Sequence, residues 1–170
     1  SGNNQSLLGI GFANLHKISS QKGNSLFGWE SESFLGSNSQ KAGWRDNWGE
    51  CFFELRLKPQ LQASQSWGLQ ILSFQKISAL LVSYLNEHKP VPTMVHGDLW
   101  SGNALVQYDG KGVILDPATW WADREVDIAM TKLFGGFSKD FYSSYQSIWP
   151  LDNNSTKRID IYNLYHLLNH

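Results

Sequence analysis

The chemistry-bearing residues of this chain are concentrated in one stretch, Val95-His96-Gly97-Asp98-Leu99-Trp100-Ser101-Gly102-Asn103, and Asp116 follows it thirteen residues later. The pattern His-x-Asp-Leu-x-x-x-Asn matches the catalytic-loop template of kinases. Phosphoryl transfer needs a carboxylate near the attacking hydroxyl and oxygen ligands that hold Mg²⁺ against the nucleotide phosphates. Two residues five positions apart on one tight loop, Asp98 and Asn103, can face the acceptor and the metal respectively.

A β-hairpin predicted after this loop returns a second carboxylate to it. We expect short strands at three places: 93–96, 104–107 and 113–115. Asp109-Gly110 forms the turn, because Asp-Gly is the strongest local hairpin signal. The last strand ends at Asp116, so the hairpin brings this residue beside Asn103. The order loop, strand, turn, strand, aspartate therefore predicts one base and two metal ligands close together.

Each of these residues also has an ordinary structural explanation when it is taken alone. We favour His96 as a buried histidine that bonds to backbone and supports the loop, rather than as a proton-transfer group. Asp98 can cap the Gly-rich turn, because aspartate readily bonds its own backbone. Asn103 and Asp116 can likewise be turn residues. The joint spacing of the set is what favours a phosphotransferase site.

Other catalytic sites have little support in the sequence. A zinc site has few ligands available, because Cys51 is the only cysteine. A serine nucleophile lacks the Gly-x-Ser-x-Gly elbow. Gly9-Ile10-Gly11 is not a phosphate-binding loop, since no Gly-Lys-Ser/Thr follows it and no strand is predicted before it. We interpret Cys51 as a buried structural thiol within a predicted helix.

Length and composition indicate a soluble globular chain. The 170 residues accommodate one domain or part of a larger one. Fourteen Lys and Arg against fifteen Asp and Glu give a net charge of −1, and the absence of a basic run argues against nucleic acid as a partner. No apolar stretch is long enough to span a membrane. The single cysteine, and residues 1–5 without signal-peptide features, favour a cytoplasmic location.

Outside the catalytic stretch, the periodicity of apolar residues predicts a mainly helical α+β chain. We expect a helix at 7–18, followed by a long Ser-, Gly- and Asn-rich loop at 19–43. Asp46 can cap a helix that stops near Pro59. Further helices are predicted at 67–87, 124–134, 139–148 and 155–168.

Several segments together resemble the fructosamine (ketosamine) kinase family. They are His96–Asn103, Leu115–Ala118, Asp123–Met130, Phe134–Phe137 and Tyr162–His170, and aromatic positions upstream are also similar. The resemblance implies the aminoglycoside-phosphotransferase-like branch of the protein-kinase-like fold, with ATP and Mg²⁺. The implied reaction phosphorylates the 3-hydroxyl of a ketosamine, which is a sugar joined to an amine by glycation. The 3-phosphate is unstable, and its loss frees the amine, so the implied role is deglycation.

The resemblance also implies roles for the residues of the catalytic stretch. Asp98 would be the base or orienting carboxylate for the sugar hydroxyl. Asn103 and Asp116 would hold Mg²⁺, with Asp116 in the place of the aspartate of the kinase Asp-Phe-Gly motif. His96 would support the loop.

For other polar and aromatic residues the resemblance leaves two roles open. Trp100 can stack on a sugar face, or it can fill the helical core. Asp123, Arg124 and Asp127 can order the metal loop or touch the acceptor, or they can form structural ion pairs.

The elements that bind nucleotide in kinases are missing from the sequence before Asp98. Kinases require a Gly-rich loop and a strand lysine, and neither Gly-x-Gly-x-x-Gly nor Val-Ala-x-Lys occurs there. We therefore expect residues 1–170 to be the catalytic C-terminal lobe without its N-lobe, and to be inactive alone. Rival interpretations are a kinase for an aminoglycoside, choline or homoserine, and a non-catalytic remnant that binds a sugar or a partner. The sequence leaves the sugar, the amine and the oligomeric state open.

Overall fold

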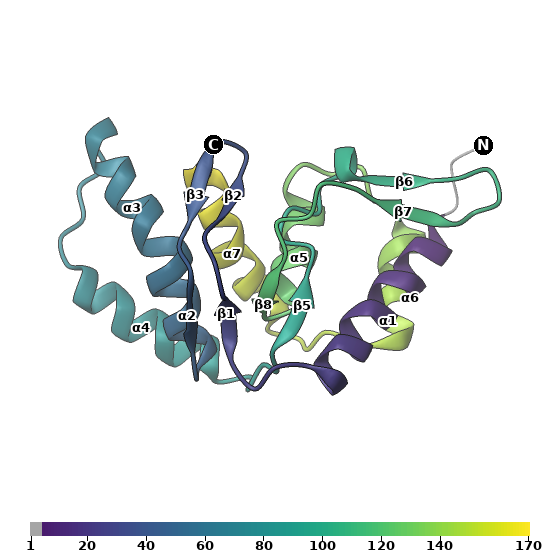
Figure 1. Ribbon diagram of the computed structural model, residues 1–170, viewed down its shortest axis with the longest axis horizontal. Helices are drawn as coiled ribbons and strands as arrows, with labels where there is room; N and C mark the ends of the chain where they lie inside the picture. The colour runs from purple at the N-terminus through teal and green to yellow at the C-terminus, as the bar shows by residue number, and fades with distance from the viewer. Residues whose placement is uncertain (1–4) are drawn as a thin grey trace.

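A computed structural model describes residues 5–170 of the chain, and shows helices packed on both sides of a small central sheet (Figure 1). The helices are α1 (Ser6–Lys22), α2 (Trp48–Phe52), α3 (Lys58–Ser64), α4 (Phe74–Asn86), α5 (Glu125–Leu133), α6 (Lys139–Ile148) and α7 (Ser155–Asn169). The strands are β1 (Phe27–Trp29), β2 (Ser33–Leu35), β3 (Asn38–Gln40), β4 (Gly43–Arg45), β5 (Thr93–Val95), β6 (Ala104–Val106), β7 (Gly112–Ile114) and β8 (Trp120–Ala122). The α+β class is as predicted.

The described helices include none that is both long and apolar enough to cross a membrane. Residues 1–4, part of the stretch where the sequence indicates no signal peptide, lie outside the described residues.

The central sheet places the catalytic stretch beside the loop that carries Asp116. Its strand order is β4-β1-β8-β5, and every neighbouring pair is antiparallel. Val95, the last residue of β5, pairs with Trp120, the first residue of β8. The chain enters the catalytic stretch directly after β5, and leaves the Asp116 loop directly before β8. The two loops are therefore adjacent at one end of the sheet.

The predicted loop at 19–43 is wrong, because this region contains the end of α1, the strands β1 to β3 and the first residue of β4. Strand β1 pairs with β4 and also with β8, so the region completes the central sheet. Gly28 makes the first pairing possible. It has a φ of +129°, and a Cβ at this position would collide with the carbonyl of Gly43.

The helix predicted to stop near Pro59 continues past it. A π-helical segment, Phe53–Leu57, joins α2 to α3, and Pro59 lies in the first turn of α3. Pro59 has no N–H to donate, and the carbonyl of Leu55, four residues earlier, accepts a hydrogen bond from Nη1 of Arg56 at 3.0 Å. The side chain of Asn47 caps α2 in place of the predicted Asp46, since it accepts from the backbone N–H of Glu50 at 2.9 Å.

The helix predicted at 67–87 begins later, at Phe74. Ser73 caps it by accepting a hydrogen bond from the backbone N–H of Lys76 at 3.2 Å. Trp67 and Leu72 lie outside the helix and are 90% and 98% exposed, so they are not on a buried face. The other predicted helices correspond to α1, α5, α6 and α7, and the predicted hairpin is β6–β7.

Trp48 lies at the centre of the core and joins several elements. Its ring packs within 6 Å of four other aromatic rings, those of Phe27, Phe52, Trp120 and Tyr162. Its Nε1 donates a hydrogen bond to the Tyr162 hydroxyl at 2.9 Å, which satisfies the indole N–H inside the core. The cluster connects α2, β1, β8 and α7, and so holds the sheet against the helices.

Candidate active site

The predicted base and metal ligands meet at one cavity. Backbone pairing of β6 with β7 extends to the N–H of Leu115, which donates to the carbonyl of Asn103 at 2.9 Å. The next residue, Asp116, therefore lies beside Asn103. Asp98, Asn103 and Asp116 line a cavity of about 490 Å³, together with Trp100 and residues of the β2–β3 hairpin.

Asn103 is oriented by Asp98. Its Nδ2 donates to the backbone carbonyl of Asp98 at 3.0 Å and to the carboxylate Oδ2 of Asp98 at 3.2 Å. Because the amide nitrogen is used in this way, the amide oxygen is directed elsewhere. Burial raises the pKa of the Asp98 carboxyl above its usual range, and this outweighs the opposing effects of His96 and the Asn103 hydrogen bond.

The donor set fits a hard divalent cation. Asn103 offers an amide oxygen and Asp116 a carboxylate, and Mg²⁺ prefers such oxygen ligands. Asp116 is exposed and has a φ of +49°, a left-handed conformation that aspartate tolerates better than most residues. Asn103 and Asp116 are therefore the residues that would hold Mg²⁺.

His96 is bonded to backbone on both sides of its ring. Its Nε2 lies 2.8 Å from the carbonyl of Leu115, and its Nδ1 accepts from the N–H of Asp98 at 3.3 Å. Since a carbonyl can only accept, Nε2 carries the proton. The ring thus ties the catalytic stretch to the end of the hairpin.

A buried carboxylate on α5 holds the backbone of the catalytic stretch. Asp127 is fully buried, and its two oxygens accept from the N–H groups of His96 at 2.6 Å and Gly97 at 2.8 Å. His16 on α1 also contacts Asp127, at 3.1 Å from Nε2, and its Nδ1 lies 2.8 Å from the hydroxyl of Tyr145 on α6. Three helices therefore fix this loop. The sequence indicates Asp127 as one of several candidates. It does not indicate His16, which stands out only as a polar residue in a mainly apolar helix.

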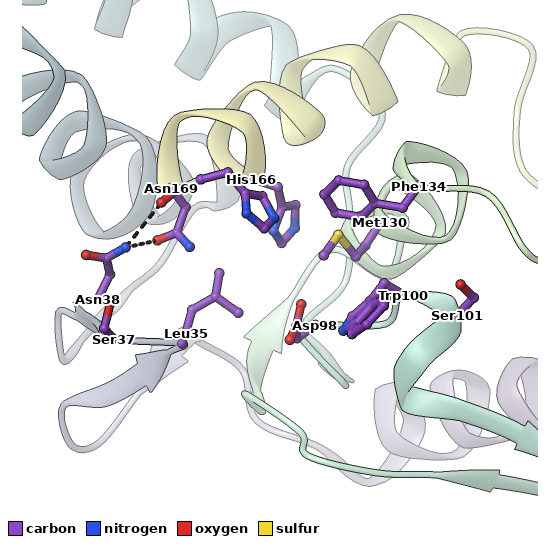
Figure 2. A pocket seen from close by; sticks show the side chains of 12 residues that line it. Leu35, Ser37, Asn38, Asp98, Trp100, Ser101, Met130, Phe134, His166 and Asn169 are labelled. Carbon is purple, nitrogen blue, oxygen red and sulfur yellow. Dashed lines mark hydrogen bonds between the residues drawn. The ribbon is translucent and has the colours of Figure 1, made fainter. Parts of the chain in front are cut away.

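A larger cavity of about 590 Å³ shares Asp98 with the first one, together with Leu35, Gly36 and Trp100 (Figure 2). It is lined by Leu35, Gly36, Ser37, Asn38, Asp98, Trp100, Ser101, Met130, Phe134, His166, Asn169 and His170. Trp100 is 40% exposed and lies over Gly102, so it faces the cavity rather than the core. Of the two roles left open for Trp100, the structure places it where a ligand ring can stack.

The larger cavity carries little charge. Asp98 is the one carboxylate among its lining residues within the described chain. Burial lowers the pKa of His166 to about 4, so this imidazole is neutral at pH 7. The rest of the wall consists of aromatic rings, aliphatic groups, hydroxyls and side-chain amides, with the Met130 thioether and the His170 imidazole.

Asp123 and Arg124 do not line either of the two cavities that contain Asp98. Asp123 is buried and accepts from Nε2 of His88 at 2.7 Å and from the hydroxyl of Tyr162 at 2.8 Å. Arg124 donates to the carbonyls of Trp149 at 2.8 Å and Pro150 at 2.6 Å. Both side chains are engaged in contacts that hold structural elements together.

A second group of possible metal ligands combines His88, Asp123 and Glu125, whose ligand atoms lie within 4.8 Å of one another. Arg158 already pairs with one carboxylate of this group, because it forms two hydrogen bonds of 2.7 Å to the two oxygens of Glu125. A cation would have to displace the arginine. We interpret the group as a buried ion-pair network.

Comparison with known proteins gives consistent matches along the chain. The family model described as fructosamine kinase matches residues 1–170. The protein named "Probable ketoamine kinase" from Vibrio cholerae serotype O1 is 40% identical over 162 residues, which cover 95% of this chain and 55% of that protein. A protein of the same description from Synechocystis sp. is 40% identical over 169 residues, covering 99% of this chain and 57% of that protein.

Solved structures share the same fold. A crystal structure assigned to a fructosamine-3-kinase of Haemophilus somnus 129PT matches with a TM-score of 0.85 at 37% identity, over 99% of this chain and 57% of that one. One from Thermobifida fusca matches with a TM-score of 0.85 at 29% identity, over 100% of this chain and 59% of that one. The chain thus spans between 55% and 59% of the length of these relatives.

Proposed function

The chain belongs to the fructosamine kinase family, and from this premise we propose that it is the acceptor- and metal-binding lobe of an ATP-dependent ketosamine kinase. The observation that carries the proposal is the meeting of Asp98, Asn103 and Asp116 at one cavity that adjoins a second, larger one through Asp98. This arrangement suits phosphoryl transfer to a hydroxyl, because one carboxylate lines both the space for the acceptor and the site that would hold the metal with the phosphates.

In this assignment the larger cavity takes the sugar. Asp98 orients the 3-hydroxyl and accepts its proton as the oxygen bonds to the γ-phosphorus of ATP, while the bond from that phosphorus to the bridging oxygen breaks and ADP leaves. Asn103 and Asp116 would hold Mg²⁺, which would neutralise charge on the nucleotide phosphates when bound. Asp127 and His96 hold the catalytic stretch in place through hydrogen bonds to its backbone and to the carbonyl of Leu115. The unstable 3-phosphate that results would release the amine.

The lining of the larger cavity favours a ketosamine over an aminoglycoside. Aminoglycosides carry several positive charges, and their binding is favoured by several acidic groups. Here Asp98 is the single carboxylate among the described lining residues. Trp100 and Phe134, which are 40% and 49% exposed, offer faces suited to a sugar ring with one amine.

We further propose that the nucleotide-binding elements belong to a part of the protein outside these 170 residues. No Gly-rich loop or paired strand lysine precedes Asp98, and the relatives are substantially longer than this chain. The isolated chain should then bind ATP weakly and turn over little. Robust Mg²⁺-dependent phosphorylation of a ketosamine by the 170-residue chain would overturn this part of the proposal.

The test of the function uses a chimaera in which the first part of the Vibrio cholerae relative precedes this chain. It is incubated with ATP and Mg²⁺ and a panel of fructosyl-amines, ribulosyl-amines and aminoglycosides. We expect phosphate transfer to the ketosamines only. Transfer to the aminoglycosides alone would identify the rival kinase, and no transfer by a folded chimaera would favour the non-catalytic remnant.

A further inference from the structure

An amide at the end of α7 is held in one orientation by two other amides. Oδ1 of Asn169 accepts a hydrogen bond from Nδ2 of Asn38 on β3 at 3.1 Å, and another from Nε2 of Gln60 on α3 at 3.0 Å. Nδ2 of Asn38 also lies 3.2 Å from the backbone carbonyl of Asn169. Residues from three distant parts of the sequence thus converge on one side chain.

This network decides which end of the Asn169 amide faces the larger cavity. Two N–H donors point at one end, so that end must be the oxygen, and the nitrogen must lie at the other. In Figure 2 this nitrogen is on the side of the amide away from Asn38, toward the space between Leu35 and His166. Asn169 lines the cavity, and within residues 5–170 no group accepts a hydrogen bond from its Nδ2.

We propose that Asn169 is a specificity-determining residue of the acceptor site, which donates a hydrogen bond from Nδ2 to a sugar oxygen. The inference rests on the proposed function, since it takes the larger cavity as the place of the ketosamine. A fixed, uncharged N–H donor is complementary to a hydroxyl or carbonyl oxygen, and gives nothing to an ammonium group. The donor therefore selects the sugar half of the acceptor rather than its amine.

The other side chains of the cavity wall are consistent with Asn169 binding the sugar half of the acceptor. Asp98 can only accept when ionised, and it serves the hydroxyl that is phosphorylated. Phe134 offers only a ring face, whereas Trp100 offers a ring face and an indole N–H. The amide nitrogen of Asn38 already donates to Asn169, so Asn38 acts as a positioning residue.

Two alanine variants separate the donor from the hydrogen bonds that hold it. Asn169→Ala removes the donor and the side-chain bonds to Asn38 and Gln60, but keeps the backbone carbonyl that Asn38 also contacts. Asn38→Ala removes both of the Asn38 bonds and leaves Asn169 held by Gln60. Calorimetric titration of the 170-residue chain with fructosyl-lysine measures the affinity of each. We expect Asn169→Ala to weaken binding about tenfold and Asn38→Ala to weaken it less than about twofold.

The possible results distinguish this inference from the proposed function. If the wild-type chain binds fructosyl-lysine and both variants bind it equally well, or are weakened equally, the role of Asn169 is wrong and the function stands. If the folded wild-type chain does not bind fructosyl-lysine, the proposed acceptor fails and the role of Asn169 fails with it.

A third variant covers the case in which Asn169→Ala does not fold. Asn169→Asp keeps oxygens for Asn38 and Gln60 but has no N–H to donate. It is tested with free fructose, which is uncharged, so that the new carboxylate cannot attract an amine. Loss of fructose binding supports the proposal, and affinity equal to wild type overturns it.

Discussion

Nδ2 of Asn103 donates to both the backbone carbonyl and the carboxylate of Asp98, at 3.0 and 3.2 Å. The residue proposed to hold the metal is thereby fixed by the residue proposed to act as the base. Its amide oxygen is left for a cation, and its amide nitrogen stabilises the ionised form of Asp98. A substitution of Asn103 should therefore alter the pKa of Asp98, and a substitution of Asp98 should alter the orientation of the Asn103 amide.

Removing this hydrogen bond should shift the pH dependence of the reaction. In Asn103→Ala the carboxylate of Asp98 loses an interaction that lowers its pKa, so the pKa rises further. A base is active when deprotonated, and the acidic limb of the kcat/KM profile should move to higher pH in the chimaera. The exposed Asn153→Ala is the matched control, and its profile should coincide with wild type. An unmoved limb in Asn103→Ala would show that Asp98 does not titrate in the profile.

The carboxylate of Asp127 should be important for stability as well as for the geometry of the loop. In Asp127→Asn one oxygen becomes an NH₂ group that faces a backbone N–H of the catalytic stretch, and a buried donor loses its partner. We expect a loss of about 2 to 4 kcal/mol in the free energy of unfolding. Urea unfolding measures it, with the exposed Asp160→Asn as a control that should change by less than about 0.5 kcal/mol.

Two glycines in α1 should respond to alanine in opposite ways. A Cβ on Gly9 would collide with the backbone of Phe141 on α6, whereas no atom lies within 4 Å of a Cβ on Gly11. Gly9→Ala should therefore destabilise the chain by about 1 to 3 kcal/mol. Gly11→Ala should stabilise it by about 0.5 to 1 kcal/mol, because alanine favours the helix. The same sign for both variants would contradict the observed packing of α1 on α6.

The buried pair of His88 and Asp123 should make stability depend on pH. Burial alone would lower the pKa of His88, but the hydrogen bond and charge of Asp123 outweigh it and raise the pKa above 6.5. The protonated histidine therefore contributes stability that is complete below pH 6.5 and is lost as the pH rises through the folded-state pKa. Wild type should lose more unfolding free energy than His88→Gln over that range. Parallel curves for the two proteins would refute the assignment.

The parts of the site that were predicted are those that lie close together in the sequence. The catalytic stretch, the Asp-Gly turn and Asp116 form one local unit, whose geometry follows from a single hairpin. Asn169 lies 66 residues beyond Asn103, and its orientation depends on Asn38 and Gln60. Such tertiary juxtapositions leave no periodic signal in a single sequence.

The fold was predicted where elements are long and periodic. Helices α6 and α7 fall in this class, because their buried positions recur with helical spacing, whereas α5 is buried at seven consecutive positions. Strands β1 to β4 lie in a stretch rich in Ser, Gly and Asn, and this composition predicts a loop. The continuation of the helix through the π-helical segment into α3 could not be predicted, for a different reason. The Arg56 side chain supplies the hydrogen bond that Pro59 cannot, and nothing local indicates it.

The central claim is that Asp98 serves the acceptor hydroxyl during phosphate transfer, and one substitution tests it most directly. In the chimaera, Asp98→Asn keeps the size of the side chain but cannot accept the proton. Steady-state phosphorylation of fructosyl-lysine should fall by about 10² to 10⁴-fold in kcat, with KM values for ATP and fructosyl-lysine changed only a few-fold. Phosphorylation by Asp98→Asn at the wild-type rate would contradict the account.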